Sequence, residues 1–120
     1  MAPVMTGAKT RAVAACLTAY DAQEQPERAT ERQAVKDVLA RLTEVAPGNS
    51  VEVRIPPYAA VQAVAGIRHR RGTPPASVEC DARTWLEVAT GRLTWADAVA
   101  AGRIFASGER SDLAALMPLV

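Results

Sequence analysis

The sequence predicts an α+β fold in which helices cover one face of a β-sheet. Apolar side chains recur at helical spacing through the first 48 residues, and from residue 51 they alternate with polar side chains, as in a strand. The connections between the expected strands are only a few residues long, which favours antiparallel pairing. Helices placed before and after these strands then form a second layer on the sheet.

Length and composition fit one globular unit. We expect 1–120 to form a single domain, with a helical part over 1–48 and the sheet with its covering helices over 49–120. Hydrophobic residues make up 49% and charged residues 22%, which argues against disorder and against a chain that inserts stably in a membrane. The net charge of +1 gives no reason to expect nucleic-acid binding.

Two helices are expected in the N-terminal part. The first covers 8–22 and carries one apolar face, made of Val13, Cys16, Leu17 and Tyr20. The second begins at Pro26, as a first-turn proline, or at Thr30, with Gln33 completing a capping box. Its apolar stripe consists of Val35, Val38, Leu39, Leu42 and Val45. Pro47-Gly48 ends it.

Strands follow in the middle of the chain. Residues 51–55 alternate between apolar and polar side chains, which predicts a strand with one dry face. Residues 59–65 are apolar apart from Gln62, which predicts a strand in the centre of the sheet. A further strand is expected over 76–80, and the loop at 67–75 leaves open whether it contains another short one.

The C-terminal part alternates helices and one strand. Asp81 is placed to cap a helix that Gly91 ends, and Thr94 to cap a shorter helix. A strand is expected over 103–107. After it, Ser111 is placed to cap a terminal helix, whose apolar stripe is formed by Leu113, Leu116 and Met117.

The segment from Ser77 to Leu119 resembles the C-terminal half of sterol carrier protein domains. In both, a strand ends at an acidic residue, a helix closes with a glycine-basic-apolar step, and a second such step opens a strand that ends in glycine. The matching positions are Asp81, Gly91-Arg92-Leu93, Gly102-Arg103-Ile104, Gly108, and Leu113 with Leu116. Together with the VEVRIPP and HRRGTPP segments, the whole chain looks like the stand-alone bacterial branch of that family.

The resemblance implies an antiparallel sheet of about five strands covered by helices on one face, with two extra N-terminal helices here. It also implies an apolar tunnel between the two layers, which holds a fatty acyl chain, an acyl-CoA ester or a sterol-like lipid. Such proteins are non-enzymatic carriers, so no catalytic residue and no cofactor are expected. The expected partner is therefore an apolar small molecule or lipid.

Candidate lining residues follow from this expectation. The apolar ones are Trp85, Leu86, Trp95, Val99, Phe105, Leu113, Leu116 and Met117. Ordinary core packing would bury the same side chains without any cavity, and this alternative stays open. Flexible Met117 suggests that the terminal helix serves as a removable lid. Possible contacts to a ligand head group are Arg54, Gln62, His69 and Arg70, although Arg54 and Gln62 could instead bond to each other or to Glu79.

Other functions find less support in the residues. His69 is the one histidine and lies in a basic loop, so an enzyme centred on it is the least favoured hypothesis. One histidine and two distant cysteines do not form a metal site. Val13-Ala14-Ala15-Cys16 resembles the end of a lipoprotein signal, but the polar stretch before it does not fit one, so we expect a cytoplasmic protein.

The main alternative is an auxiliary protein-protein interaction module. Similar domains form the C-terminal part of mycothiol-dependent isomerase-type proteins. A free-standing copy could dock on a partner enzyme or form a homodimer. A filled interior and a large exposed apolar patch would favour this alternative.

Overall fold

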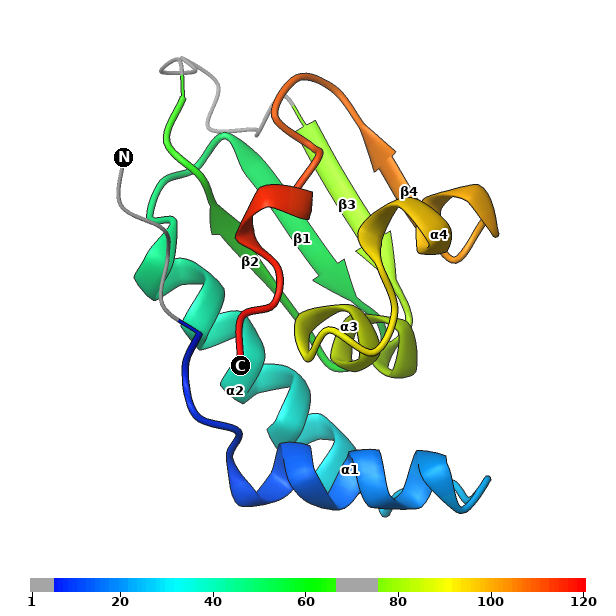
Figure 1. Cartoon of the computed structure of the whole chain (residues 1–120). Coiled ribbons are helices and arrows are strands. Elements are labelled where there is room, and N and C mark those ends of the chain that lie inside the picture. Colours follow the sequence, from blue (N-terminus) through cyan, green and yellow to red (C-terminus); the bar gives the residue numbers. More distant parts are fainter. Residues whose placement is uncertain (1–5, 67–75) are drawn as a thin grey trace.

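A four-stranded sheet with helices against one face forms the centre of the part of the chain that the structure describes (Figure 1). The structure is a computed structural model, and it describes residues 6–66 and 76–120. The helices are α1 (Arg11–Asp21), α2 (Arg28–Val45), α3 (Ala82–Ala89) and α4 (Trp95–Ala100), with a 3₁₀ turn η1 (Ala114–Leu116). The strands are β1 (Val51–Ile55), β2 (Ala59–Ala63), β3 (Ala76–Cys80) and β4 (Ile104–Ser107).

The sheet contains both parallel and antiparallel strand pairs. The expectation of an antiparallel sheet of about five strands is therefore wrong in the direction of its strands. Its order is β2-β1-β3-β4, with β1 and β3 parallel and the other two pairs antiparallel. The register explains the parallel pair, since Val51 at the start of β1 lies between Ala63 at the end of β2 and Ala76 at the start of β3. Strand β3 therefore pairs on the side of β1 that β2 leaves free. The expected fifth strand at 67–75 lies outside the described residues.

Strand alternation separates the two faces of the sheet. Val51, Val53 and Ile55 are buried, whereas Glu52 and Arg54 point to the opposite face. Strand β3 repeats the pattern, with its odd-numbered residues on the outer face. The prediction that 59–65 forms a central strand is wrong, because β2 lies at the end of the strand order and its outward side chains are exposed.

Side-chain caps fix the starts of three helices. The Asp81 carboxylate accepts from the backbone N–H of Thr84 at 2.8 Å, and the Thr94 hydroxyl accepts from the N–H of Asp97 at 3.1 Å. Both caps were expected and are confirmed. Gly91 follows α3 at φ +80°, a conformation that favours glycine, and ends the helix as predicted. Helix α1 begins later than expected, with Thr10 as its cap.

Two predictions of helix position are wrong. Helix α2 begins at Arg28, and Glu27 precedes it without a side-chain cap, so the capping box from Thr30 does not form. The expected terminal helix is only the 3₁₀ turn η1. Ser111 donates to the carbonyl of Gly108 instead of capping a helix, and Pro118 disfavours helical backbone at the residue before it.

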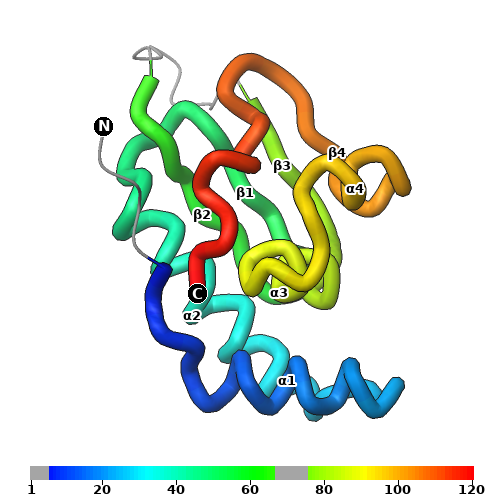
Figure 2. Tube along the Cα trace, in the orientation of Figure 1, coloured from blue at the N-terminus to red at the C-terminus, as the bar shows by residue number. Residues whose placement is uncertain are grey.

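The C-terminal segment (111–120) lies between α2 and α3. The N–H of Leu119 donates to the carbonyl of Ala89 in α3 at 2.7 Å, and Arg41 of α2 donates from Nε to the carbonyl of Leu119 at 3.3 Å. Gly7 donates its N–H to the same carbonyl at 2.8 Å. Figure 2 shows how this segment crosses β1 and β2 before it ends beside α2. The helix layer is thus completed by the chain's last ten residues. Among the helices described, none has both the length and the apolarity to span a bilayer.

Candidate functional site

An apolar layer separates the sheet from the helices and the C-terminal segment. Helix α2 contributes Leu39 and Leu42, α3 contributes Trp85 and Leu86, and the C-terminal segment contributes Leu119. All are buried together with the inward side chains of β1 and β3. This layer is where the sequence places an apolar ligand, and it is also the protein's hydrophobic core.

The predicted apolar residues divide into three groups. Four are buried in the core: Trp85, Leu86, Trp95 and Leu113. Leu116 and Met117 are half-buried and pack against this core from the C-terminal segment. Val99 and Phe105 are exposed to 42% and 68%, and Phe105 points to the outer face of the sheet. The structure therefore brings six of the eight residues to the helix side and separates two from it.

The side chain of Trp85 brings a polar group, the indole Nε1–H, into this apolar layer. Its side chain is fully buried at the middle of α3, yet the indole Nε1–H has no hydrogen-bond acceptor within residues 6–66 and 76–120. Buried indole N–H groups usually find a partner, and leaving a buried donor unpaired costs about 1–3 kcal/mol. The core thus contains a hydrogen-bond donor with nothing to accept its proton among the described residues.

The predicted head-group residues do not face this layer. Arg54 is exposed on the outer face of the sheet, where its Nε lies 3.6 Å from Glu52 and 3.7 Å from Glu79. Gln62 is exposed opposite Glu52, so Arg54 and Gln62 do not pair with each other. His69 and Arg70 lie outside the described residues. The contact between Arg54 and Glu79 that the sequence suggested is present as a loose surface ion pair.

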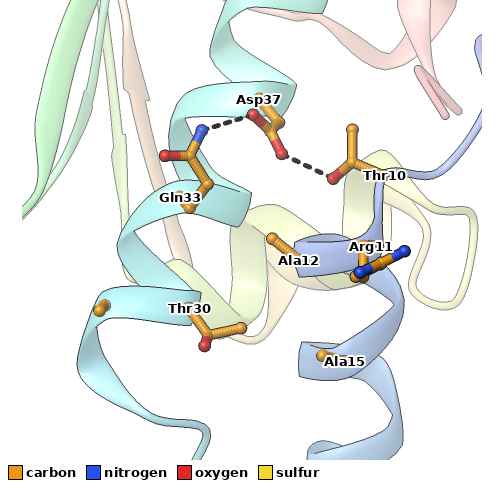
Figure 3. Close-up of a pocket in the computed structure, with 8 residues that line it drawn as sticks. Thr10, Arg11, Ala12, Ala15, Thr30, Gln33 and Asp37 are labelled. Carbon is orange, nitrogen blue, oxygen red and sulfur yellow. Dashed lines mark hydrogen bonds between the residues drawn. The ribbon is translucent and has the colours of Figure 1, made fainter.

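A groove of about 570 Å³ runs between α1 and α2 on the surface (Figure 3). Its apolar wall is made largely of alanines: Ala12, Ala15 and Ala29. At one end the Asp37 carboxylate accepts from the Thr10 hydroxyl at 2.6 Å and from Gln33 Nε2 at 2.8 Å. Each oxygen of the Asp37 carboxylate therefore already accepts a hydrogen bond from the protein, so Asp37 is not free to select a ligand.

A buried carboxylate links α1, α2 and the turn between β1 and β2, and sequence reasoning missed it. Glu31 is 5% exposed, and it accepts from the hydroxyls of Tyr20 at 2.6 Å and Tyr58 at 2.7 Å. Gln25 Nε2 donates to both of its oxygens at 3.2 Å. The available signal was spacing, because Glu31 lies four residues before Val35 on the apolar stripe of α2. We call these four residues, Glu31, Tyr20, Tyr58 and Gln25, the Glu31 cluster.

The two thiols are buried and are held in the neutral form. Burial raises the pKa of Cys16 from 9.0 to about 11, with a smaller contribution from Glu31. Burial raises the pKa of Cys80 from 9.0 to about 12, with Asp81 adding to the increase. Near neutral pH both cysteines are therefore neutral thiols. Because the thiolate is the nucleophilic form, neither cysteine is suited to nucleophilic chemistry.

These pKa shifts predict a loss of stability in alkali. A raised pKa means that the folded state prefers the neutral thiol, so its stabilising effect is complete below pH 9 and is lost as pH rises towards 11 and 12. We expect the free energy of unfolding, measured by urea denaturation, to fall over this range. In a Cys16→Ala, Cys80→Ala double variant the fall should be smaller. Parallel curves for the two proteins would contradict the prediction.

Metal ligands do not gather in the described part of the chain, where no group of three or more His, Cys, Asp or Glu side chains could hold an ion.

Comparison with known proteins gives one match to a family model. The model is described as "bacterial SCP ortholog", where SCP stands for sterol carrier protein, and it covers residues 27–119. No curated protein matches the chain. The match includes all of the described strands and helices except α1, so the chain belongs to the sterol carrier protein family, and this membership indicates lipid binding or transfer in general.

Proposed function

We propose that the protein is a non-enzymatic carrier whose apolar ligand enters the layer between the sheet, α3 and the C-terminal segment. A fatty acyl chain, an acyl-CoA ester or a sterol-like lipid fits the apolar character of this layer. Affinity would come mainly from burial of ligand hydrocarbon, at about 25 cal/mol per Å². Selectivity between chain types would accordingly be low, because few polar groups face the layer.

The unpaired Nε1–H of Trp85 is the observation that carries this proposal. A carboxylate, ester or hydroxyl oxygen at the polar end of a lipid would accept this proton. The unpaired donor would then be satisfied only in the complex, which favours a ligand with an oxygen at one end over a plain hydrocarbon. Trp85 takes the head-group role that the sequence suggested for Arg54 and Gln62.

The C-terminal segment supplies a route for entry. Leu116 and Met117 are only half-buried, and the turn η1 that contains Leu116 is short. Segments with few buried contacts open at lower free-energy cost than the core elements. Outward movement of residues 114–117 would expose the layer beside α3, while Leu113 stays in the core and Leu119 keeps its contact with Ala89 and retains the end of the segment.

The first test asks whether the protein holds lipid. Organic-solvent extraction of the purified protein, followed by mass spectrometry, should release an acyl or sterol-like compound. Sodium palmitate should then change the tryptophan fluorescence of the delipidated protein, and the response should persist in Trp95→Phe. Absence of both a co-purifying lipid and a fluorescence response would overturn the proposal.

The second test asks whether the indole N–H binds the polar end. One hydrogen bond contributes about 0.5–1.5 kcal/mol, so Trp85→Phe should weaken palmitate binding about 2- to 13-fold by calorimetry. The same variant should bind hexadecane, which lacks an oxygen, as well as the unchanged protein does. Trp95→Phe is the matched control because Trp95 is also buried but lies on α4. Equal weakening for palmitate and hexadecane would show that Trp85 contributes shape and not its proton.

A further inference from the structure

No lysine or arginine is buried in the part of the chain that the structure describes. Arg41 and Arg103 are half-buried there, and the others are exposed. Arg103 donates to the Glu87 carboxylate at 2.7 Å and to the Thr84 hydroxyl at 3.1 Å. Arg41 donates to the Glu44 carboxylate at 2.7 Å. The described residues therefore place no positive charge in the apolar layer, and the two least exposed guanidinium groups already have acceptors.

The ionisable side chains that are buried are either neutral or negative. They are Cys16 and Tyr20 on α1, Glu31 on α2 and Cys80 on β3. Burial raises the pKa values of both thiols and of Tyr20, so these three groups are neutral near pH 7. Glu31 carries a negative charge and accepts from protein donors. An anion inside the layer would thus meet neutral groups or a like charge.

Other acidic side chains of the described residues are at least partly exposed, so none of them lies inside the layer. Helices α1, α2 and α4 pack against α3. The acidic side chains on these four helices that are not buried are Asp21, Asp37, Glu44, Glu87 and Asp97. Charge around Trp85 therefore comes only from groups at the surface and from Glu31.

The Trp85 Nε1–H is a neutral donor, and this limits the kind of oxygen that it can bind in the layer. An ionised carboxylate would exchange its hydrogen bonds to water for this one bond, and burying a charge without a countercharge costs far more than burying a neutral oxygen. An alcohol, ester or ketone oxygen accepts the same proton without that cost. The carbonyl oxygen of a protonated carboxylic acid does so as well.

We propose that the layer admits lipids whose inner end carries an uncharged oxygen, such as an alcohol, a ketone or an ester, and takes up a fatty acid only as the protonated acid. This inference rests on the proposed function, because it specifies the class of ligand that the carrier accepts. A carboxyl group in water has a pKa of about 4.3, so nearly all of a free fatty acid is ionised at pH 7. Binding must then add one proton to each carboxylate.

The pH dependence of binding tests this inference with two ligands of equal chain length, sodium laurate and 1-dodecanol. Each pH unit above the carboxyl pKa lowers the neutral fraction of laurate about tenfold, so its dissociation constant should rise about tenfold from pH 7 to pH 8 in calorimetry. The dissociation constant of 1-dodecanol, the matched control, should stay the same. Calorimetry in buffers of different ionisation enthalpy should show uptake of about one proton per laurate and none per dodecanol.

A permanently charged ligand gives a second control. Sodium 1-dodecanesulfonate has the same chain length and stays ionised at both pH values, so it should bind far more weakly than 1-dodecanol. Binding of the sulfonate as tight as that of the alcohol would overturn the inference. Laurate binding that is equally tight at pH 7 and pH 8, without proton uptake, would do the same and leave the carrier function standing. If neither laurate nor 1-dodecanol binds, the carrier function fails and the inference fails with it.

Trp85→Phe shows which form of the ligand meets the indole. At pH 7 the substitution should weaken laurate and 1-dodecanol by the same factor, because both present a neutral oxygen to Nε1. Trp95→Phe, which removes the other buried indole, should weaken neither. The tenfold change of laurate binding between pH 7 and pH 8 should persist in Trp85→Phe, since no countercharge is gained or lost. A loss in Trp85→Phe that is confined to laurate would mean that the indole binds an anion, and would contradict the inference.

Discussion

Glu31→Ala is expected to lower the free energy of unfolding by about 3 kcal/mol, as measured by urea denaturation. The substitution removes the acceptor of two phenol protons and of the Gln25 amide. The Tyr20 hydroxyl is buried, so without the carboxylate it stays desolvated and unpaired. The loss also releases three segments from one another, because the Glu31 cluster joins α1, α2 and the β1–β2 turn.

Variants within the cluster test this explanation. Tyr58→Phe leaves the carboxylate with its other donors and should cost only about 1 kcal/mol. Glu44→Ala is the matched control, since Glu44 lies on the same helix but is exposed and pairs with Arg41 at the surface; it should change stability by less than about 0.5 kcal/mol. A loss for Glu31→Ala no larger than that for Glu44→Ala would show that the cluster does not stabilise the fold.

The raised pKa values of Tyr20 and Tyr58 agree with this structural role. Burial is the main cause for both, followed by the hydrogen bond to Glu31 and its negative charge. The neutral phenol is the form that donates a proton to a carboxylate, so the cluster holds both tyrosines in the state that it needs. Arg83 adds to the packing, with its guanidinium 5.1 Å from the centre of the Tyr20 ring.

Local signals in the sequence predicted the local structure well. Alternation over Val51–Ile55 identified both the strand and its buried face, and Asp81 and Thr94 marked helix starts, because a cap depends on residues three positions apart. The resemblance to sterol carrier proteins, drawn from the second half of the chain, is confirmed by a family match over residues 27–119.

Features set by distant contacts could not be predicted in the same way. In β4 the neighbours Ile104 and Phe105 are both apolar, so the sequence does not say which of them is buried, and the pairing of Ile104 with the buried Cys80 decides it. The parallel pairing of β1 and β3 depends on which side of β1 the chain reaches after β2. Glu31 lies on the buried side of α2 before its apolar stripe, and the hydroxyls of Tyr20, from another helix, and of Tyr58, from a turn 27 residues later, explain why it can be buried there.

Leu119→Ala should lower the free energy of unfolding by about 3 kcal/mol, because it opens a cavity in the layer where α2 and α3 meet the C-terminal segment. The leucine side chain is fully buried, and its backbone joins Ala89, Gly7 and Arg41. Leu116→Ala, the same substitution three residues earlier, is the matched control. Leu116 is half-buried, so it should lose only about 1 kcal/mol.

The rate of ligand release should rank the two leucine variants in the opposite order from stability, with the larger change in Leu116→Ala. If residues 114–117 move outward to admit a lipid, Leu116→Ala weakens the contact that must break, and bound palmitate should leave faster in stopped-flow fluorescence. Leu119 holds the end of the segment in place during this movement, so its replacement reduces stability more than it changes the exit rate. Faster palmitate release from Leu119→Ala than from Leu116→Ala would place the moving part at the end of the segment. Equal losses in the free energy of unfolding would contradict the difference in burial between the two leucines.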